Sequence, residues 1–205
     1  MFERFVGRFP PGQGSDPEPW DDQRFRRIEG LSELIGIGAG VSFGDGIIRV
    51  HSERDSLNSL ALVREMFPEF AKSALPIAQD WMGRQFVVNI EDGQILLLEP
   101  GSGEAFEIDC GISDLFNAEF VSDPLTYLAL DLFDEWVATN SVLPAPGQCV
   151  GFKVPLFLGG EGEVSNLEIV DAQVYWALLG QLKTGIKDLP PGAKVSEVSI
   201  GLGDE

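Results

Sequence analysis

The chain has 205 residues, of which 44% are hydrophobic, so it is long enough to bury a substantial core. It carries 33 acidic against 14 basic residues, which gives a formal net charge of −19 at pH 7. This balance argues against a binder of nucleic acid or of an anionic membrane, because either would need a basic face. The charge fits plain solubility, or a basic protein partner whose association an acidic field accelerates.

The two cysteines, Cys110 and Cys149, lie far apart in the sequence and form neither a disulfide framework nor a zinc pattern. We expect free thiols in a reducing cytoplasm, and no bound metal or cofactor. The first residues lack the apolar core of a signal peptide. No apolar run reaches the roughly 20 residues that a membrane helix needs. The sequence therefore predicts a cytoplasmic protein without a membrane partner.

Residues 1–30 are expected to form a short helix followed by a proline-rich arm. Phe2, Phe5, Val6 and Phe9 share one helical face, and the string PPG at residues 10–12 ends that segment. The polar stretch after it is typical of a loop or a tether. Whether the helix belongs to the core or docks late, as an arm, stays open at this point.

A first motif-like string is the glycine series Gly36, Gly38 and Gly40. A dinucleotide-binding loop requires G-x-G-x-x-G at the start of a helix. Here a turn follows at residues 44–46, and then a β-like stretch at residues 47–50. The glycines therefore do not indicate a phosphate-binding loop, and no Walker-type G-K-[ST] string is present either.

A second string, GVSFG at residues 40–44, matches the nucleophile elbow G-x-S-x-G around Ser42. That elbow needs a helix directly after it and an acid and a histidine later in the chain. The only histidine is His51, nine residues on, and no helix fits between the two. A hairpin explains the string better, and His51 is expected to be a partly exposed residue at a strand end.

In the middle of the chain, the sequence predicts a helix and then a meander of antiparallel strands. The helix spans residues 56–67, with Ser56 as its cap and Pro68 after its end. A first strand at residues 75–79 contains Pro76, which favours a position at the sheet edge. The strands that follow are separated by turn signals and lie at residues 84–90, 94–99 and 105–108.

Two helices are predicted next. The first spans residues 112–121 with Ser113 as its cap, and the second runs from Pro124 through Val137 after a cap at Ser122 or Asp123. The apolar residues of the second helix recur at helical spacing and include Trp136, which we interpret as a core residue. Its opposite face carries three acids: Asp131, Asp134 and Glu135.

Several short strings between residues 31 and 185 stand out by their order and spacing: SF at 42–43 with Gly46 and RVH at 49–51, DWMGRQF at 80–86, LEPGSGE at 98–104, GFKVP at 151–155, LGG at 158–160, NLE at 166–168, VYW at 174–176 and GQL at 180–182. Together they resemble the C-terminal domain of type VI secretion immunity proteins. Members of this family occur together with GAD-like domains and are more loosely related to the SUKH superfamily.

The resemblance implies an α/β (α+β) fold, with a central, mainly antiparallel sheet flanked by helices in a single domain. That domain would span residues 31–185, after the arm of residues 1–30 and before a C-terminal tail or edge strand at residues 186–205. The family offers no catalytic residues to transfer, so we expect no enzyme activity. It implies instead a cytoplasmic antidote to a delivered toxin, often a nuclease.

Most residues of these strings have structural interpretations. The pair Asp80–Trp81 is expected in a buried turn, with Arg84 paired to a carboxylate, either Asp80 or Glu99. The glycines at residues 159–160 permit a sharp turn. In addition, Asn166 would bond backbone groups of its loop, and Asp171 would cap the helix that begins near Tyr175 and Trp176.

The leading hypothesis is thus a non-catalytic immunity protein that binds a cognate toxin, with a basic nuclease as the candidate class. The acidic contacts would be Asp131, Asp134 and Glu135 on the helix, and Glu161 and Glu163 on the glycine loop. One alternative is a regulatory or scaffold domain. Another is a hydrolase that uses a pair of carboxylates. The sequence does not decide the oligomeric state.

Overall fold

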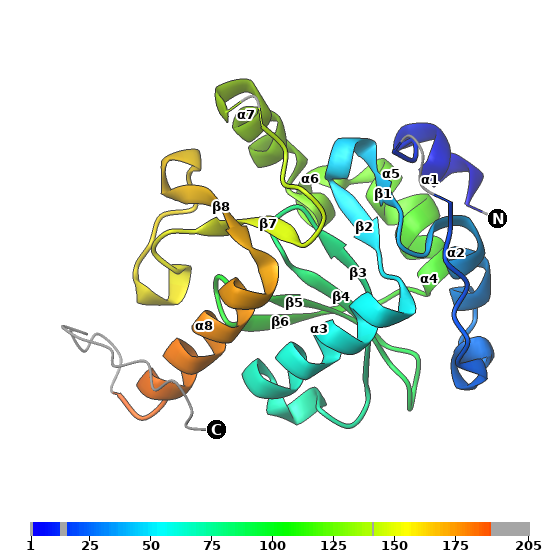
Figure 1. Ribbon diagram of the computed structural model, residues 1–205, viewed down its shortest axis with the longest axis horizontal. Coiled ribbons are helices and arrows are strands. Elements are labelled where there is room, and N and C mark those ends of the chain that lie inside the picture. The colour runs from blue at the N-terminus through cyan, green and yellow to red at the C-terminus, as the bar shows by residue number, and fades with distance from the viewer. Residues whose placement is uncertain (1, 13–15, 141, 190–205) are drawn as a thin grey trace.

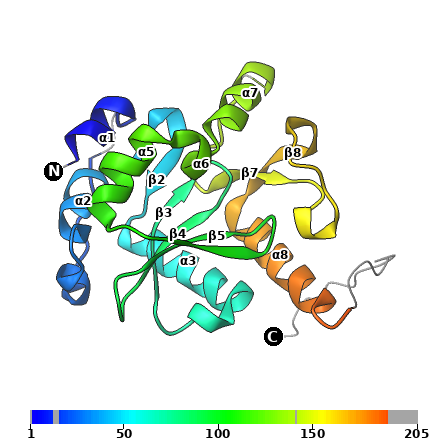
Figure 2. The same cartoon turned by 180° about the vertical axis from the view of Figure 1, so that it is seen from behind.

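The computed structural model describes residues 2–12, 16–140 and 142–189. Helices cover both faces of an antiparallel sheet, which confirms the predicted fold class (Figures 1 and 2). The predicted tail or edge strand at residues 186–205 lies outside the described residues from residue 190 onward. In the described part of the chain, no helix combines the length and the apolar character needed to cross a membrane.

The main sheet is a six-stranded meander in which each strand pairs with the next one in the chain. The predicted hairpin turn at residues 92–93 joins two of its central strands. The strands are β1 (Ser42–Phe43), β2 (Ile48–Val50), β3 (Ala74–Asp80), β4 (Gln85–Asn89), β5 (Ile95–Glu99) and β6 (Glu104–Ile108).

Pro76 does not mark an edge strand, contrary to the prediction, because β3 lies between β2 and β4. The register between β3 and β4 shifts between Pro76 and Ala78. A proline has no N–H to donate. Such an irregularity is one of the few features that allow an interior strand to contain a proline.

One face of the sheet is covered by α3 (Glu53–Met66) and α8 (Ala172–Ile186), which pack against each other. The start of α3 lies three residues before the predicted one because Ser52, not Ser56, caps the helix. The Ser52 Oγ accepts from the N–H of Asp55, and the Asp55 carboxylate accepts from the N–H of Ser52. The predicted Asp171 cap of α8 is confirmed, since its carboxylate accepts from the N–H of Val174 at 2.9 Å.

The other face is covered by α1 (Glu3–Arg8), α2 (Leu31–Gly38) and the helical segment at residues 112–122. The hairpin predicted for the string at residues 40–44 is present as the antiparallel pair β1–β2, whereas Gly36 and Gly38 lie in α2, a helix that the sequence did not predict. Leu31 and Leu34 are buried three residues apart, and Gly38 lets the helix approach Phe43, whose ring would lie 2.9 Å from an added Cβ. Burial of these leucines thus outweighs the low helix propensity of glycine.

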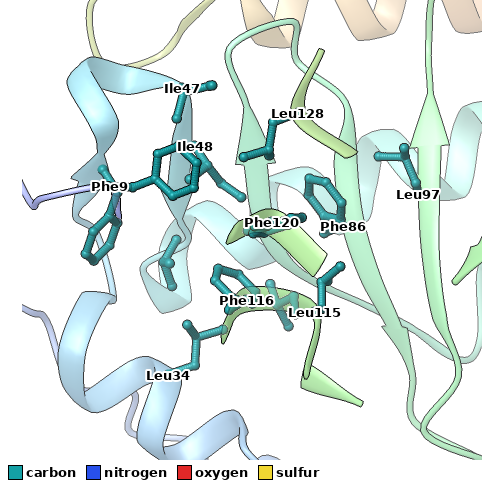
Figure 3. Close-up of a cluster of buried hydrophobic side chains, with 14 of the residues drawn as sticks. Phe9, Leu34, Ile47, Ile48, Phe86, Leu97, Leu115, Phe116, Phe120 and Leu128 are labelled. Carbon is teal, nitrogen blue, oxygen red and sulfur yellow. The ribbon is translucent and has the colours of Figure 1, made fainter. Parts of the chain in front are cut away.

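The N-terminal phenylalanines belong to the largest core cluster. Phe2, Phe5 and Phe9 are buried, and the Phe5 ring meets the Phe116 ring edge-on at 5.1 Å. Figure 3 shows Leu34 beside Phe116, and Phe116 and Phe120 together near the sheet. The side chain of Asn117 accepts hydrogen bonds from the backbone N–H groups of Arg4 and Phe5, so it holds the start of α1.

The segment at residues 112–122 changes helix type along its length. A π-helical turn, η4 (Leu115–Glu119), separates α4 (Ile112–Asp114) from α5 (Phe120–Ser122), and Gly111 rather than Ser113 precedes the first turn. The long helix predicted after it is two helices, α6 (Pro124–Leu128) and α7 (Leu130–Asn140). Ala129 interrupts them with φ 49° and ψ 46°.

A second, two-stranded sheet consists of β7 (Gln148–Phe152) and β8 (Leu167–Asp171). The backbone N–H of Val150 donates to the carbonyl of Trp81, which joins this sheet to the β3–β4 turn. Short helical turns complete the described structure: η1 (Gln23–Arg27), η2 (Gly44–Gly46), η3 (Pro68–Phe70), η5 (Leu156–Leu158) and η6 (Val164–Asn166).

Candidate functional site: an acidic surface at α7 and the glycine loop

The β3–β4 turn is built around a buried ion pair. The Nε of Arg84 lies 2.6 Å from Oδ2 of Asp80, and Oδ1 of Asp80 accepts from the N–H groups of Met82 and Arg84. Burial raises the pKa of the Asp80 carboxyl, and the Arg84 guanidinium opposes that rise. Of the two partners that the sequence left open for Arg84, the structure selects Asp80.

The same turn holds the break between α6 and α7. The Nη2 of Arg84 donates to the carbonyl of Tyr127 at 3.0 Å, and the indole Nε1 of Trp81 donates to the carbonyl of Leu128 at 2.9 Å. The Trp81 ring also packs edge-on against Phe133 at 5.3 Å. These bonds satisfy carbonyls at the end of α6 that the interrupted helix leaves without partners. Beyond the break, α7 extends away from the sheet (Figures 1 and 2).

The turn also anchors the C-terminal elements. The indole of Trp176 on α8 donates to the carbonyl of Gly83 at 2.7 Å. Gly83 has φ +79°, and an added Cβ would lie 2.8 Å from the Sγ of Cys149 on β7. Burial raises the pKa of the Cys149 thiol, and Cys149 and Cys110 are both free, as predicted. The string DWMGR at residues 80–84 is therefore the point at which the main sheet meets α7, β7 and α8.

The exposed face of α7 carries the predicted acids. Asp131, Asp134 and Glu135 are exposed, whereas Phe133 and Trp136 point into the protein and are buried. The interpretation of Trp136 as a core residue is thus confirmed. Its indole N–H donates to the carbonyl of Val142, which holds the chain that leaves α7.

The glycine loop at residues 154–166 is held in shape by hydrogen bonds between the Asn166 side chain and the loop backbone. The Oδ1 of Asn166 accepts a hydrogen bond from the backbone N–H of Val154, and its Nδ2 donates to the carbonyls of Val154 and Glu161. Gly160 passes so close to this backbone that an added Cβ would lie 1.9 Å from the Val154 oxygen. The predicted roles of Gly160 and Asn166 are confirmed. The loop holds Glu161 and Glu163 in exposed positions.

The two groups of acids lie on neighbouring elements, because α7 contacts η6, which begins directly after Glu163. We call the five side chains together the acidic surface: Asp131, Asp134, Glu135, Glu161 and Glu163. The sequence named these five residues as candidate contacts but did not indicate the role of Trp81 and Arg84 in positioning α7. No local pattern encodes hydrogen bonds that span more than 40 residues.

His51 is buried, contrary to the prediction of a partly exposed residue. Its Nε2 lies 2.7 Å from the Oε1 of Gln85 and 3.4 Å from the Oγ of Ser59, and burial lowers its pKa. Ser42, the serine of the elbow-like string, lies on β1 and accepts from Arg49 instead. The geometry provides no serine–histidine pair of the kind that the string suggested.

A groove with a volume of about 910 Å³ lies between η1, α3 and the β4–β5 turn. None of its lining residues belongs to α7 or to the glycine loop. Of its carboxylates, Glu53 accepts from the backbone N–H groups of Asp21 and Asp22, so it serves the fold. In the described ranges, no three His, Cys, Asp or Glu side chains are grouped so that they could hold a metal ion.

A known protein family matches the C-terminal part of the chain. Residues 113–183 match the family model described as T6SS immunity protein Tdi1, C-terminal. The resemblance to type VI secretion immunity proteins, predicted from short strings, is thereby confirmed for this segment. The matched segment contains α7, the glycine loop and α8, and therefore the whole acidic surface.

The fold has a solved counterpart. The crystal structure of Atu4351 from Agrobacterium tumefaciens is similar with a TM-score of 0.61, over 88% of this chain and 89% of that chain. Sequence identity is 17%, so the likeness shows a shared fold. A comparison with curated proteins gave no match.

Proposed function

We propose that the chain is a non-catalytic immunity protein that binds and neutralises a cognate toxin of type VI secretion. The observation that carries this proposal is the family match over residues 113–183, because that segment also bears the acidic surface. It contains ten acidic and two basic residues. The proposed site of action is the cytoplasm, where a delivered toxin would meet its antidote.

Charge provides the mechanism of capture. A protein with a formal charge of −19 attracts a basic partner over distances comparable to the Debye length of about 8–10 Å, and it does so less at high salt. A nuclease must present a basic cleft to its nucleic-acid substrate. Carboxylates held on a rigid helix and loop can occupy such a cleft, so a nuclease is the toxin class that this surface fits best.

The proposal is tested by capture from lysate of the source organism. The bait is the full chain, compared with a surface variant that carries lysine at all five positions of the acidic surface. A control variant reverses five other exposed acids, Glu29, Glu33, Glu65, Glu69 and Glu91, and so has the same net charge.

We expect the wild-type chain and the control variant to retain a basic secreted effector that elutes as salt is raised. The surface variant should not retain it, although its thermal unfolding is unchanged. Equal retention by the two variants would mean that another surface makes the contact. Recovery of a housekeeping partner in place of a toxin would contradict the immunity function itself.

A further inference from the structure

The strand β6 forms an open edge of the main sheet. It pairs with β5 on one side, and the described residues provide no strand on the other. Residues 104–107 are exposed. Alternate residues of an antiparallel edge strand direct their N–H and C=O groups away from the sheet, so β6 presents backbone donors and acceptors to a further strand.

The opposite edge of the sheet, at β1, differs from the β6 edge because a segment of the same chain covers it. There Pro11 forms a bridge with Phe43 of β1. The N–H of Gly12 donates to the carbonyl of Ser42, and the N–H of Gly44 donates to the carbonyl of Pro10. The N-terminal segment thus occupies the β1 edge, where its proline also blocks further pairing.

The side chains of β6 define which strand would fit. Glu104 and Glu107 are exposed on opposite faces of the strand, because they lie three residues apart. Between them, Phe106 is 43% exposed and lies opposite Leu97 of β5 in the register of the sheet. A second copy of β6 would bring like charges together, which disfavours pairing between copies of this chain.

We propose that the β6 edge binds an extended basic segment of a partner protein by adding it as a seventh strand. The segment would carry two basic residues three positions apart, opposite Glu107 and Glu104, and an aliphatic residue opposite Phe106. Main-chain hydrogen bonds would supply affinity, and the two charge pairs would set the register. The β6 edge lies outside residues 113–183, so this proposal does not depend on the proposed immunity function.

The probe is the peptide acetyl-TKVTKT-amide, titrated into the ¹⁵N-labelled full chain. In an antiparallel register its lysines face Glu107 and Glu104, and its valine faces Phe106. Two control peptides carry N-methyl groups, one on the odd-numbered and one on the even-numbered residues. Only alternate N–H groups of an added strand face the sheet, so one control should lose binding and the other should keep it.

We expect chemical-shift changes centred on the amides of residues 104–108. The double variant E104K/E107K should weaken binding of the peptide by about tenfold and should bind acetyl-TEVTET-amide instead. A matched control, E65K/E69K, changes the net charge equally on α3 and η3 and should bind the first peptide like the wild-type chain.

Three results would overturn the proposal. If both N-methylated peptides bind as well as the parent peptide, the association is non-specific attraction to an acidic protein. If the shifts centre on the acidic surface at α7, the assigned site is wrong. If size-exclusion chromatography shows that β6 pairs copies of this chain, the assigned occupant is wrong.

Discussion

At the scale of single residues, the most informative position is Ala129. Its left-handed conformation is rare for a residue with a Cβ and costs about 1 kcal/mol. Neither the sequence around it nor helix propensity predicts a break there, because alanine is the best helix former. The break persists because Trp81 and Arg84 bind the carbonyls on its N-terminal side.

We therefore expect A129G to leave the free energy of unfolding unchanged or to raise it by up to about 1 kcal/mol, since glycine adopts this conformation freely. The matched substitution A138G, at an exposed position inside α7, should lower it by about 1 kcal/mol. Urea denaturation of both variants measures the difference. Equal losses would show that residue 129 is helical in solution.

The buried pair Asp80–Arg84 gives a second prediction. R84M leaves the Asp80 carboxyl buried without its cation, and we expect a loss of about 3–5 kcal/mol in the free energy of unfolding. The double variant D80N/R84M removes the charge as well and should be more stable than R84M alone. A double-mutant cycle by urea denaturation measures the coupling, and additive losses would contradict a direct pair.

The burial of His51 leads us to expect that the free energy of unfolding depends on pH. Its pKa in the folded chain is lowered from 6.5, mainly by burial; Gln85 and Asp55 oppose this shift, and Arg49 adds to it. The unfolded state therefore binds the proton more readily, so the stability contributed by neutral His51 is complete above pH 6.5 and is lost as the pH falls below it.

H51Q removes this titration, so its unfolding free energy should depend less steeply on pH between about pH 7 and pH 5. Parallel curves for the variant and the wild-type chain would show that His51 keeps its ordinary pKa in the fold. Equilibrium unfolding in urea at several pH values supplies both curves.

At the scale of elements, the sequence predicted those features that neighbouring residues determine. The strands β4, β5 and β6, the Asp171 cap and the bonding of Asn166 follow from alternation, turn residues and local side-chain chemistry. The α2 helix was not predicted and the α6–α7 break was predicted wrongly as one continuous helix, because contacts between distant segments decide both. Likewise the acidic residues could be named from the sequence, but not their gathering through the contact of α7 with η6.

The rigidity of the glycine loop yields a prediction at this scale. G160A forces a Cβ against the Val154 carbonyl and should lower the free energy of unfolding by about 1–3 kcal/mol. The neighbouring substitution G162A meets no atom within 4 Å and should change it by less than about 0.5 kcal/mol. Thermal unfolding of the two variants tests this, and equal effects would contradict the close packing of the loop.

At the scale of the whole molecule, charge and architecture act together. The fold holds α7 and the glycine loop at one end of the protein through the turn at residues 80–84, and it leaves the β6 edge open elsewhere. The net charge of −19 would draw a basic partner to the protein, and the positions of the rigid elements would select how that partner docks. The composition alone suggested such a partner, and the fold shows that the proposed acidic contacts lie on neighbouring elements.

The growth of cells that produce the captured effector is the most direct test of the immunity function. Coexpression of the wild-type chain should restore growth, and so should the control variant with reversed charges at Glu29, Glu33, Glu65, Glu69 and Glu91. The variant with lysines at the acidic surface should fail to restore it, although it accumulates to the same level. If the wild-type chain does not protect the cells, the chain is not the antidote of that effector, and the proposed function is wrong.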